Sequence, residues 1–199
     1  MHLLLFSGFL GSGKTTLVIP IAKAVAGSGH RVAIVANEIG EIGIDNQFMR
    51  QLDLNVWELV AGCICCTLSG DLIAMLQELD SGYAPDLVIV EASGAANPQS
   101  VLSALPYYKG RPLSSVRTAS VVDPLRLEML MEVLTPLVTS QIQHADVIII
   151  SKTDLAKPEE IGFAHRTVRE INPKAGIVNT GIPGHLEPEL ISGLLPWLN

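Results

Sequence analysis

Short apolar runs recur along the chain, and polar or glycine-rich turns separate them. Runs that are rich in Val, Ile and Leu without strict alternation are typical of parallel strands covered on both faces. The runs predict strands over residues 2–7, 31–36, 55–60, 86–91, 114–122, 146–150 and 175–179.

Between these runs, apolar residues return every three or four positions, as Leu72, Leu76 and Leu79 do. This spacing predicts helices over residues 16–26, 69–79, 128–134, 137–144 and 158–171, and a last helix from about 187 to the end at Asn199. Regular alternation of strands and helices predicts an α/β fold: one domain over residues 1–199, with a mostly parallel sheet and helices on both faces.

The turn after the first strand, residues 8–15, reads Gly-Phe-Leu-Gly-Ser-Gly-Lys-Thr and fits the phosphate-binding loop of P-loop NTPases. Its glycines allow successive N–H groups to point at phosphate oxygens, and the following helix adds positive partial charge. Lys14 would reach the β- and γ-phosphates, and the Thr15 hydroxyl would bind Mg²⁺. The residues expected to bind the nucleotide here are Gly8, Gly11, Ser12, Gly13, Lys14, Thr15 and Thr16. The alternative is a glycine-rich turn with a solvated Lys14.

The predicted strand at residues 86–91 ends in an acid, Glu91, as the Walker B strand of such proteins does. Glu91 could hold Mg²⁺ directly or through water, so Lys14, Thr15 and Glu91 are the candidate catalytic residues. Gly94 follows, and its amide could sense the γ-phosphate.

Two further segments carry candidate ligands for a second metal. Glu38 and Glu41 lie in a glycine-punctuated loop after the second strand, and their carboxylates could contact either Mg²⁺ or the second metal. An ordinary solvated loop is the alternative. The three cysteines of the chain, Cys63, Cys65 and Cys66, lie within four residues. Thiolates this close could share one ion such as Zn²⁺ and leave a tetrahedral site one ligand short. The alternative is a set of buried cysteines that act as small hydrophobic residues.

The strand at residues 146–150 leads into Ser151-Lys152-Thr153-Asp154, which resembles the Asn-Lys-x-Asp motif of GTPases. An ionised Asp154 accepts hydrogen bonds that guanine offers and adenine does not, and Lys152 can lay its stem along the base. Ser151 replaces the usual asparagine and so loses an amide that would approach guanine N7 and brace the loop. We therefore expect weaker guanine binding with its preference intact, and a loop from Thr180 that could close over the base. The alternative is a capped turn before the next helix.

Composition narrows the class of protein. With 199 residues and a net charge of −7, the chain is long enough for a substantial core and is not a general binder of nucleic acids or anionic membranes. Its apolar runs are shorter than the roughly 18 residues of a membrane span. The first run leads into the phosphate loop without a basic region before it, so it does not predict a signal peptide. We expect a cytoplasmic protein.

Taken together, the phosphate loop, the acidic loop, the Cys-x-Cys-Cys segment, the Glu91 strand and the Ser151–Asp154 segment resemble the CobW family of metallochaperone GTPases. This family is related to the urease and hydrogenase maturation GTPases. The resemblance covers the chain to about residue 180. It extends to the nucleotide-binding domain alone and not to the C-terminal domain that larger relatives carry. It implies GTP hydrolysis with Mg²⁺, coupled to delivery of Zn²⁺ or Co²⁺ to a client metalloprotein or cofactor-dependent enzyme.

The residues identify no arginine finger and no water-positioning glutamine, so we expect slow hydrolysis until a partner or a second subunit of a homodimer completes the site. Two other classes stay open: a P-loop small-molecule kinase, and a non-hydrolysing scaffold that assists assembly of a cofactor-dependent enzyme. Asp154 and the clustered cysteines disfavour the kinase.

Overall fold

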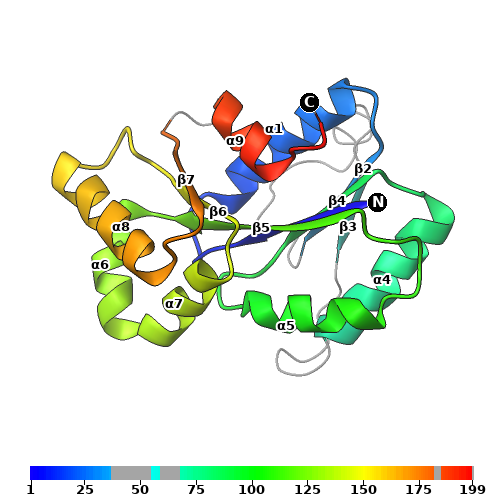
Figure 1. Ribbon diagram of the computed structural model, residues 1–199, viewed down its shortest axis with the longest axis horizontal. Helices are drawn as coiled ribbons and strands as arrows, with labels where there is room; N and C mark the ends of the chain where they lie inside the picture. The colour runs from blue at the N-terminus through cyan, green and yellow to red at the C-terminus, as the bar shows by residue number, and fades with distance from the viewer. Residues whose placement is uncertain (37–54, 59–67, 182–184, 199) are drawn as a thin grey trace.

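The computed structural model describes residues 1–36, 55–58, 68–181 and 185–198, and its strands form one sheet (Figure 1). The strands are β1 (His2–Ser7), β2 (Val32–Ala36), β3 (Asn55–Glu58), β4 (Leu87–Glu91), β5 (Ser115–Val122), β6 (Val147–Ile150) and β7 (Gly176–Asn179). Their order across the sheet is β3-β2-β4-β1-β5-β6-β7, and every neighbouring pair is parallel. The strand β1 therefore lies at the centre.

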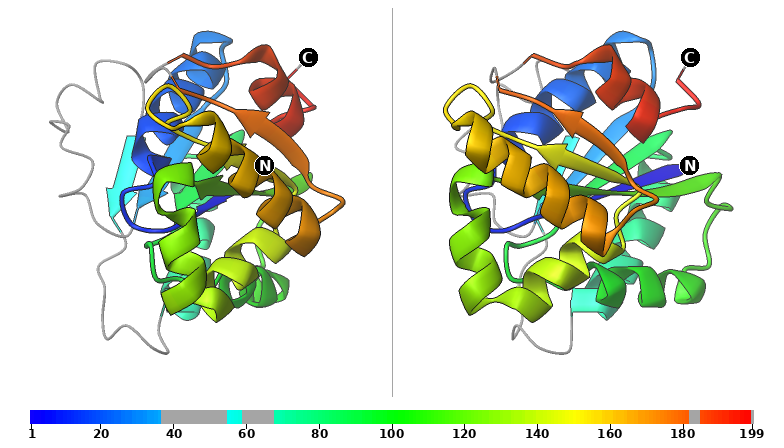
Figure 2. Two further views of the ribbon diagram at one scale, coloured as in Figure 1. Left: turned by 90° about the vertical axis from the view of Figure 1, so that its left-hand side faces the viewer. Right: turned by 60° about the vertical axis from the view of Figure 1, so that its left-hand side comes forward.

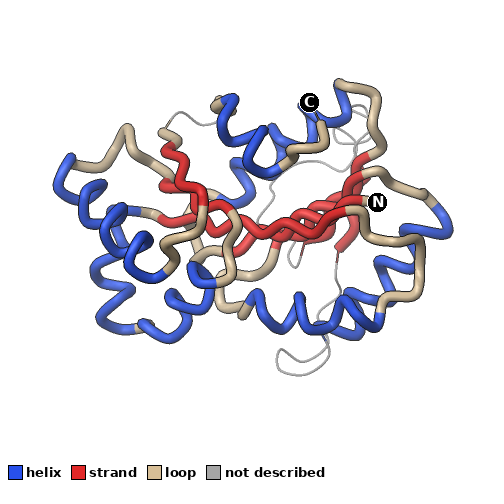
Figure 3. The backbone as a smooth tube through the Cα atoms, in the orientation of Figure 1, coloured by secondary structure: helices blue, strands red, loops and turns tan. Residues whose placement is uncertain are grey.

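Helices cover both faces of the sheet, as the sequence predicts (Figure 3). They are α1 (Lys14–Gly27), α4 (Leu68–Gly82), α5 (Pro98–Ala104), α6 (Pro124–Val133), α7 (Thr135–Gln143), α8 (Pro158–Ile171) and α9 (Pro188–Leu194), with a 3₁₀ turn at Leu105–Tyr107. The two helices α1 and α9 lie together on one face, and α4 to α8 lie on the other (Figure 2). In the part of the chain that the structure describes, none of these helices has the length and apolar character to cross a membrane.

Alternate residues of each central strand belong to different cores. Leu4 and Phe6 of β1 pack with α1 and α9, whereas Leu3 and Leu5 pack with α4 and α5. A third core lies under β5 and β6 and is built with α6, α7 and α8. Because both faces are covered, the strands bury apolar side chains in both directions, which explains their continuous apolar runs.

The largest differences from the predicted helices concern α6, α5 and α9. The helix predicted to begin at residue 128 begins at Pro124, because the Asp123 side chain accepts from the Leu125 amide and caps it. Helix α5, which was not predicted, begins in the same way with an Asn97 cap. The last helix ends at Leu194 rather than at Asn199. Pro196 follows Leu195 and disfavours helical backbone there, and Leu195 adopts φ −129° and ψ 62°.

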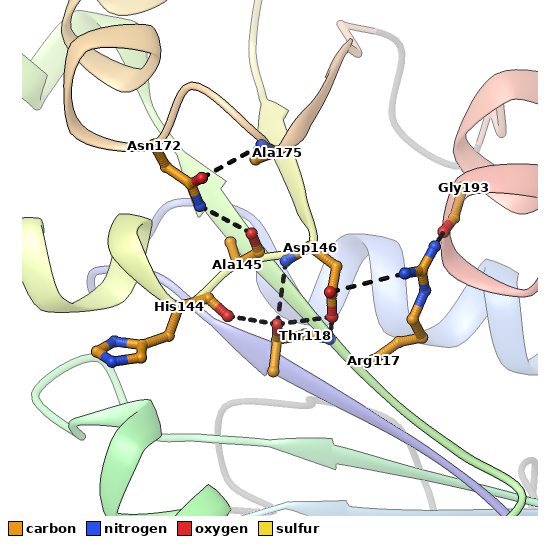
Figure 4. Close-up of polar contacts among 8 residues, drawn as sticks. All are labelled: Arg117, Thr118, His144, Ala145, Asp146, Asn172, Ala175 and Gly193. Atoms are coloured by element: carbon orange, nitrogen blue, oxygen red, sulfur yellow. Dashed lines mark hydrogen bonds and ion pairs between the residues drawn. The ribbon is translucent and has the colours of Figure 1, made fainter.

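Polar contacts fix the amino-terminal ends of β6 and β7 and join β6 to the middle of β5 (Figure 4). The Thr118 amide donates to an Asp146 carboxylate oxygen at 2.8 Å, and Arg117 lies 3.6 Å from the other oxygen of that carboxylate. The Asn172 side chain donates to the Ala145 carbonyl and accepts from the Ala175 amide. These contacts hold the register of the sheet at the end opposite to the candidate site.

An aromatic cluster joins the end of the chain to the start of the sheet. The His2 ring stacks on Trp197 with centroids 4.1 Å apart, and His30 meets the same indole edge-on at 5.2 Å. His2 Nδ1 also lies 2.8 Å from the Ser115 hydroxyl. Burial of the ring, and next the nearby amino terminus, lower the pKa of His2 below its ordinary value, although Asp86 opposes the shift.

The lowered pKa of His2 predicts a loss of stability on acidification. As the pH falls below about 6.5, the unfolded chain takes up this proton more readily than the folded chain, so the free energy of unfolding decreases. His2→Phe keeps a ring against Trp197 and removes the titration. Urea unfolding at pH 7.5 and 5.5 should show a smaller loss for the variant than for the wild type. An equal loss in both proteins would contradict this role of His2.

Candidate nucleotide-binding site

The candidate residues gather at one edge of the sheet, because the carboxyl ends of parallel strands all face the same way. The phosphate loop follows β1, Gly94 follows β4 and Ser151 follows β6. Thr180 follows β7. The register pairs Phe6 of β1 with Glu91 of β4, which brings the Walker B acid next to the start of the loop.

The loop requires glycine at its first position. Gly8 has φ +136°, and a Cβ atom there would lie 2.4 Å from the Val121 carbonyl oxygen on the neighbouring strand. Gly11 and Gly13 also have positive φ, at +76° and +96°. Helix α1 begins at Lys14, within the last two residues of the loop motif, so its amino terminus faces the loop as the sequence predicts.

Lys14 is buried within the loop, with 5% of its surface exposed. Its Nζ donates to the Gly8 carbonyl at 2.9 Å and to the Phe9 carbonyl at 3.3 Å. Both carbonyls lie at the start of the loop, so the ammonium spans the loop that would surround a phosphate. This position fits the predicted role of the lysine.

Thr15 and Glu91 come together across 76 residues of sequence. The Thr15 hydroxyl donates to the Glu91 carboxylate at 2.6 Å, and Glu91 is 7% exposed. Hydroxyl and carboxylate oxygens are the ligands that Mg²⁺ accepts from proteins. The residues present therefore fit a magnesium ion, with Thr15 as a direct ligand and Glu91 as a direct or water-mediated one.

Side chains from later segments hold the outer side of the phosphate loop. Arg126 of α6 donates to the Leu10 carbonyl at 2.8 Å, and its guanidinium lies 5.5 Å from the Phe9 ring centroid. Lys152 Nζ donates to the Gly11 carbonyl at 2.7 Å. No local pattern points to Arg126, because its contact depends on how α6 packs.

Ser151 also braces this loop. It is 5% exposed, and its hydroxyl donates to the Ser12 carbonyl at 2.8 Å, with the Val122 carbonyl 3.2 Å away. The expectation that the serine gives up the brace is therefore wrong, because its short hydroxyl reaches the loop directly. The expected loss of a contact with guanine N7 remains a prediction.

A pocket of about 200 Å³ lies beside the loop, where the resemblance to GTPases places the base. Its lining comprises Ser12, Gly13, Thr16, Leu17, Ser151, Lys152, Asp154, Leu155, Thr180 and Gly181. Gly181 approaches the Asp154 amide so closely that a Cβ atom would lie 2.8 Å from its nitrogen. The loops that follow β6 and β7 therefore pack together at this pocket. Thr180 lies in its lining, and its contact with the base stays a prediction.

Gly94 lies directly against the phosphate loop. A Cβ atom on Gly94 would be 2.4 Å from the Leu10 nitrogen, so only glycine fits. The Gln141 side chain of α7, 3% exposed, donates to the Gly94 carbonyl at 3.1 Å and to the Ala96 carbonyl at 3.3 Å. Sequence reasoning missed Gln141, which holds the segment proposed to respond to the γ-phosphate.

The candidate ligands of the second metal cannot be placed in the same way. Glu38, Glu41, Cys63, Cys65 and Cys66 lie outside the described residues. Within the described ranges, no group of three or more His, Cys, Asp or Glu side chains gathers closely enough to hold a metal ion. The thiolate site stays a prediction from the sequence.

The parallel sheet, the phosphate loop before α1 and the Glu91 strand define a P-loop NTPase fold. A family model described as "CobW/HypB/UreG, nucleotide-binding domain" matches residues 2–179, and the chain belongs to this family.

Several relatives resemble the chain over most of its length. Zinc chaperone YjiA of Escherichia coli is 30% identical over 182 residues, which cover 87% of this chain and 55% of YjiA. Zinc-regulated GTPase metalloprotein activator 1 of Schizosaccharomyces pombe is 28% identical, over 88% of this chain and 44% of its own. The chain thus spans about half the length of these relatives.

Solved structures agree on the fold. Zn(II)-bound YjiA GTPase from E. coli matches with a TM-score of 0.67 and 24% identity, over 96% of this chain and 60% of that one. Hydrogenase maturation factor HypB from Archaeoglobus fulgidus matches with a TM-score of 0.68 and 17% identity, over 100% and 91% of the two chains.

The hydrogen bond from Ser151 to the phosphate loop predicts that loss of the serine hydroxyl weakens nucleotide binding. Ser151→Ala leaves the buried Ser12 carbonyl without this donor, which costs about 1–3 kcal/mol, or roughly 5- to 150-fold in GDP affinity if the cost falls on the bound loop. Ser103→Ala, which removes an exposed hydroxyl on α5, is the control and should leave the affinity unchanged. Titration with a fluorescent GDP analogue measures both. Equal affinities for Ser151→Ala and the wild type would show that this hydrogen bond does not support nucleotide binding.

Proposed function

We propose that this chain binds and hydrolyses GTP and couples its nucleotide state to the binding and delivery of a transition metal, with zinc as the first candidate. The observation that carries the nucleotide part is the pocket in which Ser12 and Gly13 of the phosphate loop adjoin Lys152 and Asp154. A nucleotide needs this adjacency, because its base and its phosphates must bind together. Membership of the CobW/HypB/UreG family supports the same reading.

Hydrolysis in this proposal is achieved by positioning and charge neutralisation. The loop amides and Lys14 would stabilise the negative charge that develops on the β- and γ-phosphate oxygens. A magnesium ion held by Thr15 and Glu91 would add positive charge at the same oxygens. Gln141 is a poor candidate for orienting the attacking water, because its amide donates to Gly94 and Ala96. The proposal keeps the expectation from the sequence that turnover is slow until a partner or a second subunit completes the site.

The metal in this proposal is cargo, bound by Cys63, Cys65 and Cys66 with Glu38 or Glu41 as a further ligand. Thiolates favour Zn²⁺, and the names of two relatives, zinc chaperone and zinc-regulated GTPase metalloprotein activator, point the same way. Cobalt remains the second candidate. The recipient is a client metalloprotein or a cofactor-dependent enzyme, and the change at the γ-phosphate would release the ion.

Exchange of one atom at the base pocket tests the nucleotide assignment. Asp154→Asn replaces a carboxylate that only accepts with an amide that also donates, so guanine loses its match and xanthine gains one. Phosphate release should then shift from GTP toward XTP. The measurement is steady-state hydrolysis of GTP, XTP and ATP by the wild type and the variant, with Mg²⁺ present.

Lys14→Ala supplies the blank for contaminating activity, since loss of this charge should lower turnover on the order of a hundredfold. ATP hydrolysis equal to GTP hydrolysis in the wild type would contradict the assignment of Asp154. Transfer that depends on an added acceptor would indicate a kinase. GTP that remains intact with metal present would support a non-hydrolysing scaffold.

A further inference from the structure

A buried carboxylate that the proposed reaction does not use lies beside the base pocket. Asp123 follows β5, and its side chain is 3% exposed. One carboxylate oxygen accepts from the Leu125 amide at 3.0 Å and caps α6. The other lies 2.7 Å from Lys152 Nζ, so the same group joins the helix to the guanine-motif lysine.

Lys152 is held in a conformation that lysine rarely adopts. Its φ is +53°, and among the described residues only Ala84 is another non-glycine residue with positive φ. Such backbone persists where surrounding contacts determine it, and it concentrates at functional sites. Here the lysine ammonium has two fixed partners, the Asp123 carboxylate and the Gly11 carbonyl of the phosphate loop. Both contacts draw the side chain across the site.

We propose that Asp123 is a positioning residue that sets the affinity for guanine nucleotides through its ion pair with Lys152. The ammonium links Asp123 to the phosphate loop, and the lysine lines the base pocket. Without the Asp123 carboxylate, the Lys152 ammonium loses one of its two fixed partners, and the aliphatic stem of the lysine is free to move away from the base. This inference rests on the proposed guanine-nucleotide function.

Asp123→Asn removes the ion pair with Lys152 but keeps the helix cap. Asparagine caps helices about as well as aspartate, so its oxygen can still accept from the Leu125 amide. Its amide nitrogen then faces the Lys152 ammonium, and two donors cannot pair. We expect GDP affinity to fall about tenfold, the scale of one hydrogen bond to a charged group. Lys152→Met, which keeps an apolar stem without the charge, should weaken binding to a similar degree.

The combined variant tests whether the two residues act together. If Asp123 acts through the ammonium, Asp123→Asn should cause no further loss of GDP affinity in the Lys152→Met protein. This comparison removes both charges at once, so it remains available if Asp123→Asn alone fails to fold. Asp80→Asn is the matched control, because Asp80 pairs with Arg111 away from the pocket. The control should lower the thermal midpoint and leave GDP affinity unchanged.

Calorimetric titration measures the GDP affinity of each protein, and thermal unfolding without nucleotide measures its thermal midpoint. Wild-type GDP affinity in Asp123→Asn would overturn the inference, as would losses that multiply in the double variant. Tight GDP binding by the wild type with either result would leave the proposed function intact. A wild type that binds no guanine nucleotide would overturn the function and the inference together.

Discussion

The site depends on where the carbonyl groups of the phosphate loop point. Each carbonyl from Gly8 to Ser12 accepts a hydrogen bond. The donors are Lys14 for Gly8 and Phe9, Arg126 for Leu10, Lys152 for Gly11 and Ser151 for Ser12. A carbonyl turned toward a phosphate would repel it, so fixing these groups leaves the loop amides for the anion. The loop is thereby arranged before a nucleotide arrives, which is how electrostatic stabilisation becomes effective in catalysis.

The topology of the sheet supplies those donors. Arg126, Ser151 and Lys152 lie 116, 139 and 141 residues from the carbonyls that they contact. They reach the loop because β5 and β6 follow β1 across the sheet, and because parallel strands end at one edge. The continuous burial of β1 on both faces then fixes the position of the loop relative to its neighbours.

Local sequence patterns predicted the elements and motifs that are formed by residues close together in the sequence. The strands, most helices, the loop and the choice of Thr15 and Glu91 as candidate magnesium ligands follow from apolar runs, glycine spacing and an acid at a strand end. Arg126 and Gln141 were missed, since an arginine or glutamine on an amphipathic helix reads as an ordinary surface residue. Asp123 was also missed, because its contact with Lys152 depends on two strands lying side by side. The cysteine segment lies outside the described residues and stays a prediction.

In the proposed function, nucleotide state and metal affinity are linked. The direct measurement is Zn²⁺ affinity under reducing, anaerobic conditions with GDP, a non-hydrolysable GTP analogue or no nucleotide, repeated on Cys65→Ser. Linkage is reciprocal and typically amounts to about 1–3 kcal/mol, so the proposed function predicts Zn²⁺ binding roughly 5- to 150-fold tighter with the GTP analogue than with GDP. It also predicts much weaker binding by the cysteine variant. Equal Zn²⁺ affinity in all three nucleotide states would contradict the claim and leave a nucleotide-binding protein with an incidental metal site.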